Sequence, residues 1–213
     1  MNRTAIILIA AAVVAGCSQL GIRGDGVIKT EDRSVPEFTR VAITGGYQAS
    51  WSAGKPALSI SADQNLLPLV RTVVSGGTLV IDAQENLAAS KDIKVILSSA
   101  SLADVQLTGG ISFTADQISG RDLRVEATGA SEINIAGSVT NLEANLTGAS
   151  GLHAKSLQTQ TAVLTLVGAA EAEIAVTDTL KASVTGAGSL TYSGSPKTVE
   201  KTIVGAGTIQ NRP

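Results

Sequence analysis

The sequence has few of the side chains that usually carry chemistry. Its 213 residues include one cysteine, one histidine, one tryptophan, two tyrosines and two phenylalanines. Zinc sites draw their ligands from several Cys and His residues, so no metal site of that kind is expected. One cysteine cannot form a disulfide within the chain. With aromatic residues so scarce, the core must consist of Val, Ile, Leu and Ala, which suits a thin, repetitive β-fold.

Charge and long apolar runs are also scarce. Sixteen Lys and Arg oppose eighteen Asp and Glu, for a formal net charge of −2, and the charges are scattered. No basic patch indicates a nucleic-acid partner. The apolar run from Ala5 to Val14 is too short to span a bilayer, and it follows a short start that carries Arg3. This pattern is typical of a signal peptide.

Val14-Ala15-Gly16-Cys17 closes that run and resembles the lipobox of bacterial lipoproteins. The resemblance implies that residues 1–16 are a lipoprotein signal peptide and that Cys17 is lipidated, which would attach the chain to a membrane. Ser18 follows the cysteine in place of an aspartate, and by the same resemblance this implies the outer membrane of the bacterial envelope. The alternative is an ordinary signal peptide with a chance cysteine.

A glycine unit recurs through the second half of the chain. Its copies are LTGG, ATGAS, LTGAS, LVGAA, VTGAG and IVGAG, and their first glycines are Gly109, Gly129, Gly148, Gly168, Gly186 and Gly205. The successive spacings are 20, 19, 20, 18 and 19 residues. A period of this length without helical patterning indicates a solenoid whose rungs are strands.

Apolar and polar residues alternate around each glycine, so each rung is predicted to have one buried face and one solvent-exposed face. The sequence therefore predicts an all-β fold, a single-stranded right-handed parallel β-helix with rungs of about 19–20 residues. A left-handed hexapeptide helix is the alternative, but it would require a strict six-residue period. Residues 17–30 are expected to form a polar tether and residues 31–213 one solenoid domain. Within it, irregular early coils and a cap precede residue 100, and Asn65–Val74 is the one segment with helical character, limited by Pro68.

The order of four segments resembles a known family. ITGGYQASW is followed by SADQNLLPLVRTVVSGGTLVI, by KVILSSASLADVQLTGG and then by the repeated TGA units. This arrangement is similar to the GIN head domain family of bacterial envelope proteins, which is named for an autotransporter adhesin. The resemblance covers residues 35–210. It implies a β-solenoid, a location outside the cytoplasm and an adhesin role, and it brings no catalytic residues.

Searching the repeats for chemistry gives one candidate surface. Thr108, Thr128, Thr147 and Thr185 each precede a repeat glycine on the outward phase, so they are expected to align as a ladder that could bind an ordered surface such as a polysaccharide. The competing explanation is that threonine is simply a good strand residue.

His153 is expected to be an exposed polar residue. Glu132 and Glu171 share a repeat position two rungs apart, about 10 Å, too far for one ion.

The sequence thus predicts a lipid-anchored envelope protein that binds or adheres without catalysis and without a cofactor. Its expected partners are the membrane, through the N-terminal lipid, and a glycan or an envelope protein. Two alternatives stay open: an envelope scaffold or stress-related lipoprotein that binds another envelope protein, and a degenerate carbohydrate-active β-helix enzyme. The ligand, the oligomeric state and the choice between periplasm and cell surface lie outside what the sequence establishes.

Overall fold

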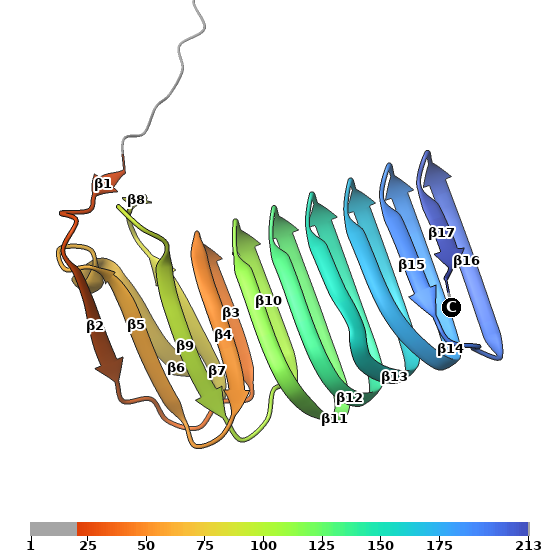
Figure 1. Ribbon diagram of the computed structural model, residues 1–213, viewed down its shortest axis with the longest axis horizontal. Helices are drawn as coiled ribbons and strands as arrows, with labels where there is room; N and C mark the ends of the chain where they lie inside the picture. Colours follow the sequence, from red (N-terminus) through yellow and green to blue (C-terminus); the bar gives the residue numbers. More distant parts are fainter. Residues whose placement is uncertain (1–20, 213) are drawn as a thin grey trace, which may run out of the picture.

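The computed structural model describes residues 21–212, which form a β-solenoid with a cap at its N-terminal end (Figure 1). The regular part consists of parallel strands stacked along one axis. Its strands are β10 (Asp104–Gly109), β11 (Ser112–Gly129), β12 (Glu132–Gly148), β13 (Gly151–Gly168), β14 (Glu171–Gly186), β15 (Ser189–Ser193), β16 (Thr198–Gly205) and β17 (Thr208–Asn211). The predicted parallel solenoid is confirmed.

Each of the long strands from β11 to β14 makes one complete rung. Its first residues form one side of the solenoid, the chain then bends, and its second half forms the other side and ends at the next repeat glycine. The repeat glycines are register partners from rung to rung, as in Gly109–Gly129 and Gly129–Gly148. The spacing between successive glycines is therefore the length of a rung, as predicted. In Figure 1 these corners line up along the upper edge, where the arrowheads lie.

Glycine is required at these corners because the rungs approach each other through their backbones. Gly129 has a φ of +116°, a region that residues with a Cβ rarely adopt. A Cβ at this position would lie 2.6 Å from the carbonyl oxygen of Gly109 in the preceding rung. That oxygen already accepts a hydrogen bond of 2.9 Å from the backbone of Ala130. The glycine thus lets the chain turn while keeping the rungs hydrogen bonded.

The inward positions form continuous apolar columns between the two sides. One column is Val105, Val125, Ala144, Leu164 and Ala182, all buried. Because each rung buries its inward face only against its neighbours, stability accumulates along the stack. The buried Ser131 and Ser150 follow two corners, and their hydroxyls donate to the carbonyl oxygens of Gly109 and Gly129 at 3.2 and 3.3 Å. These polar groups are therefore satisfied inside the core.

The first regular rung comes earlier in the chain than the sequence indicated. It consists of β3 (Arg40–Gly45) and β4 (Tyr47–Ala53), which pair in parallel with β10 and with the start of β11. Between β4 and β10 the chain leaves the stack, builds the cap and returns. The expectation of irregular early coils before residue 100 is therefore wrong for residues 40–53 and right for the cap.

The cap is built on the other side of that first rung. Its elements are β5 (Ala57–Asp63), η1 (Leu67–Leu69), β6 (Val70–Ser75), β7 (Thr78–Ala83), β8 (Leu87–Ala88) and β9 (Ile93–Ser99). β7 and β9 continue the two sides in parallel, and β6 and β5 close them in antiparallel pairing. The helical character expected in residues 65–74 amounts to the one 3₁₀ turn η1, because Pro68 removes a backbone donor.

The expected tether over residues 17–30 is too long. β1 (Ile22–Arg23) pairs with β8, and β2 (Ile28–Arg33) lies antiparallel on the outer edge of β5. The polar composition that suggested a tether arises because β2 is an exposed edge strand with the sequence IKTEDR. Within residues 21–212 the first strand therefore begins at Ile22. A chain that starts at Ser18 retains every contact described here.

Candidate functional site

The threonines predicted as a ladder are aligned in the structure. Thr108 is the register partner of Thr128, and Thr128 is the partner of Thr147. Val167 comes next and separates Thr147 from Thr185, so the column is interrupted at one rung. All of these side chains are exposed. The interruption corresponds to the repeat sequences, because LVGAA and the last copy, IVGAG, carry valine where the other four copies carry threonine.

One member of the column was missed. Thr44 precedes Gly45 at the corner of the first rung and is the register partner of Thr108. The ITGG segment resembles the later repeats in sequence, but Gly45 lies far outside the period of about 20 residues that relates the later glycines, so Thr44 was not included in the predicted ladder. The exposed column, which we call the corner ladder, therefore consists of Thr44, Thr108, Thr128, Thr147, Val167, Thr185 and Val204.

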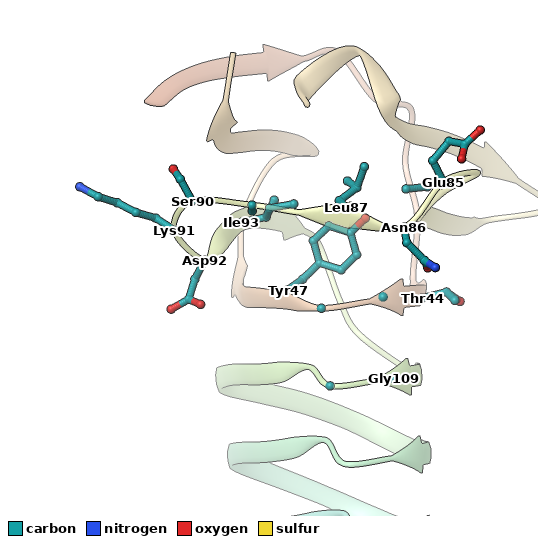
Figure 2. A pocket seen from close by; sticks show the side chains of 15 residues that line it. Thr44, Tyr47, Glu85, Asn86, Leu87, Ser90, Lys91, Asp92, Ile93 and Gly109 are labelled. Atoms are coloured by element: carbon teal, nitrogen blue, oxygen red, sulfur yellow. The ribbon is translucent and has the colours of Figure 1, made fainter. Parts of the chain in front are cut away.

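A pocket lies where the corner ladder reaches the cap (Figure 2). Its volume is about 700 Å³, within the range of small-molecule sites. One side is formed by the corners of the first two rungs, including Thr44 and Gly109, and the other by the cap segment that carries β8. Lys91 and Asp92 lie in the same segment and are exposed. No sequence motif indicates this pocket, because its two sides come from segments that meet only in the folded chain.

Tyr47 provides a polar group inside the pocket. Its side chain is 4% exposed, and Figure 2 shows the ring rising from β4 with its hydroxyl between Leu87 and Asn86. Burial, with a smaller effect from the Asp82 carboxylate, raises the pKa of Tyr47 to about 12. The phenol therefore stays protonated and can both donate and accept a hydrogen bond.

A second polar cluster lies on the opposite side of the solenoid. His153 projects outward from β13 between Glu132 of the preceding rung and Glu173 of the next. Its Nε2 contacts Glu132, its Nδ1 lies 3.4 Å from Glu173 Oε2, and Lys155 Nζ lies 2.9 Å from the other oxygen of Glu173. His153 is thus only half exposed and is paired, contrary to the expectation of a simple exposed side chain.

The cluster has room because Gly151 carries no side chain. Gly151 separates Glu132 from Glu171 in the register, and a Cβ there would lie 2.5 Å from Glu132 Oε2. Within residues 21–212 no group of three or more His, Cys, Asp or Glu side chains is arranged to hold a metal ion. The cluster is therefore an ion-pair network that ties three rungs together.

Two features of the predicted anchor fall outside the structural description. Cys17 and the signal segment 1–16 lie among residues 1–20, which the structure does not describe. Within the described part of the chain, no helix has the length and apolar character needed to cross a membrane.

The fold and the exposed ladder define a class: a β-solenoid that presents one repetitive face. The chain belongs to the family described as "Putative auto-transporter adhesin, head GIN domain", whose model matches residues 37–196. This confirms the resemblance read from the sequence. None of the curated proteins compared with the chain matches it.

Solved structures share the fold. A "putative adhesin" from Bacteroides fragilis has a TM-score of 0.72 at 20% identity, over 90% of this chain and 100% of that one. A "putative lipid binding protein" from Parabacteroides distasonis has a TM-score of 0.54 at 19% identity, and a "putative adhesin" from Parabacteroides merdae has 0.52 at 20% identity. The chain covers 99% of each of these two, and each covers 90% of this chain. At these identities the likeness shows the fold alone.

Proposed function

We propose that this protein is a lipid-anchored adhesion module of the bacterial outer membrane that binds a glycan surface through its corner ladder, without catalysis. The observation that carries the proposal is the alignment of Thr44, Thr108, Thr128 and Thr147 as direct register neighbours with exposed side chains. Parallel rungs repeat about every 4.8 Å, so the threonine hydroxyls form a regular row. A regular row of donors and acceptors matches a polymer with a regular repeat.

The charge of this face also supports a neutral partner. The column next to the ladder contains Gln106, Glu126, Asn145, Thr165 and Ser183. It is mostly uncharged, so little desolvation of ions would accompany binding. Membership of the head GIN domain family is a separate support for the adhesin role.

A glycan array with the chain from Ser18 tests the proposal, using the parent and a Thr128→Glu/Thr147→Glu variant. The two carboxylates place charge in the middle of the ladder, so binding should fall at least tenfold. The matched control is Ser138→Glu/Gln158→Glu, which adds the same charges to two adjacent exposed positions at the opposite bend. Equal binding by parent and ladder variant would contradict the proposal. Binding only to an envelope protein would favour the scaffold alternative.

The lipid anchor is proposed from the sequence around Cys17 and has a structural consequence. Ile22 of β1 is five positions after Cys17, and an extended chain spans at most about 3.5 Å per residue. A lipid on Cys17 would therefore hold the cap within about 20 Å of the membrane. Membrane fractionation of the full chain should find the parent in the outer membrane and Cys17→Ser released. A Cys17→Ser protein that stays membrane bound after signal cleavage would contradict the anchor.

A further inference from the structure

We infer that the pocket between the cap and the first two corners binds one neutral sugar unit, and that the Tyr47 hydroxyl is its central hydrogen-bonding group. This inference rests on the proposed function and adds a specific site to it. The corner ladder alone is a repetitive surface that offers similar groups at each rung. The pocket breaks that repetition at one end, and its volume of about 700 Å³ is large enough for a small ligand.

Tyr47 presents its hydroxyl to the pocket although the residue as a whole is only 4% exposed. Within residues 21–212 the one fully buried side-chain atom without a hydrogen-bond partner is Asp104 Oδ1, so the Tyr47 hydroxyl is not sealed in the core. A phenol that faces a pocket can both donate to and accept from a ligand or water there. Burial of the ring fixes the position of this hydroxyl, so it can act as a placed hydrogen-bonding group.

The residues that line the pocket carry charges of both signs. Among those within residues 21–212, Lys91 is the one cation, and Glu85 and Asp92 are carboxylates. An anionic ligand would be expected to face several cations, so it does not fit this set. An acyl chain would need an apolar lining. The pocket offers hydrogen-bond donors and acceptors beside the partly buried Leu87 and the buried Ile93. This combination suits a sugar, which carries hydroxyl groups on an apolar ring.

The pocket is continuous with the corner ladder. Thr44 lines the pocket and is also the first member of the corner ladder. Figure 2 shows Thr44 at the end of β3 with Gly109 of the next rung beside the pocket. A glycan with one unit in the pocket could therefore continue from Thr44 to Thr108 and Thr128, along the row of corners. The pocket would bind the terminal sugar of a glycan, and the corner ladder would bind the sugars that follow.

Tyr47→Phe is the sharpest test because it removes the hydroxyl and little else. Isotope-labelled protein starting at Ser18 is titrated with glucose, galactose, mannose and N-acetylglucosamine, and the amide signals of Gly46, Gly110 and Lys91 are followed by NMR. We expect at least one sugar to shift these signals saturably. Tyr47→Phe should weaken the binding of that sugar about tenfold, and the thermal midpoint of unfolding should stay unchanged or rise. Tyr192→Phe makes the same change at the far end of the solenoid and should bind like the parent.

Phosphoethanolamine and a neutral tetrapeptide serve as comparison ligands. If either shifts the pocket signals and no sugar does, the sugar assignment is wrong. If sugars shift only signals of the ladder, such as those of Thr128 and Thr147, the pocket inference is wrong while the proposed function stands. If Tyr47→Phe binds the sugar as tightly as the parent, the role of the hydroxyl is overturned.

Discussion

Thr44 and Thr108 are direct neighbours on the surface, although the whole cap lies between them in the chain. They are register partners in the parallel pair of β3 and β10, and both are exposed. The chain leaves the stack after β4 and returns at β10 to the free edge of β3. One row of threonines therefore joins two distant parts of the sequence and leads into the pocket at the cap.

The interruption of this row offers a gain-of-function test. Val167 is 39% exposed and occupies the place of a threonine. Val167→Thr adds a hydroxyl at nearly constant shape, so it should tighten glycan binding about two- to tenfold if the ladder is the contact face. Val163→Thr is the matched control, since Val163 is 41% exposed on the same strand but two columns away. Affinity is measured on the glycan found on the array, and equal affinity of both variants would argue against the ladder.

The corner glycines should be intolerant of any side chain. Gly129→Ala places a Cβ at a φ of +116° and 2.6 Å from the oxygen of Gly109. The free energy of unfolding should fall by about 1–3 kcal/mol from backbone strain alone. Gly120→Ala is the control, because no atom lies within 4 Å of a Cβ there. Urea unfolding compares the two, and a Gly129→Ala protein as stable as the parent would refute the role assigned to the corner.

Asp63 should make the cap sensitive to acid. It is fully buried and accepts hydrogen bonds from Ser90 Oγ at 2.5 Å, from Ser90 N at 2.9 Å and from Gly26 N at 2.8 Å. The Ser90 hydroxyl bond, together with the backbone donors, holds the pKa of Asp63 below its usual value. Its ionised form therefore stabilises the fold above the unfolded pKa of about 3.9, and this contribution is lost as the pH falls through the lowered pKa.

Asp63→Asn should accordingly lower the thermal midpoint at pH 7 by several degrees and flatten its decline between pH 5 and pH 2. The amide cannot accept from all three donors, so at least one is left unpaired. Asp116→Asn changes an exposed carboxylate in the bend of β11 and serves as the control. Parallel pH profiles of Asp63→Asn and the parent would show that Asp63 is not the acid-sensitive group.

His153 should respond to pH in the opposite sense. Its partial burial opposes protonation, but the hydrogen bonds and charges of Glu132 and Glu173 outweigh it, so the pKa of His153 is raised. The stabilisation by the protonated ring is complete below the unfolded pKa of about 6.5 and is lost as the pH rises through the raised pKa. His153→Gln should remove this change from the thermal midpoint measured between pH 5 and pH 9.

The titration of His153 can be read directly, because it is the only histidine in the chain. Its ring proton signals should give a pKa above 6.5, and Glu173→Gln should move that pKa down. A ring that titrates at or below 6.5 in the parent would contradict the pairing with both glutamates.

The repeats could be predicted because they are local. Each glycine corner, such as Gly129, is encoded by its own residues, and the apolar positions two before and four after it alternate with the pleat of a strand. The positions of Thr108, Thr128 and Thr147 followed from this period alone. The predicted tether was wrong for residues 28–30 because a polar composition is found both in flexible segments and in edge strands. β2 pairs with β5 through its backbone, and that pairing does not depend on the side chains.

The sequence by itself determined the solenoid, the length of its rungs and the outward row of threonines, because a short period and a two-residue alternation carry that information. Only the tertiary structure decided that β3 and β10 are neighbours, that Thr44 joins the row, and that Tyr47 lines a pocket with the segment around β8. It also placed His153 between two glutamates. These contacts depend on where the chain returns after a long excursion, and backbone pairing at a strand edge leaves no local pattern in the side chains.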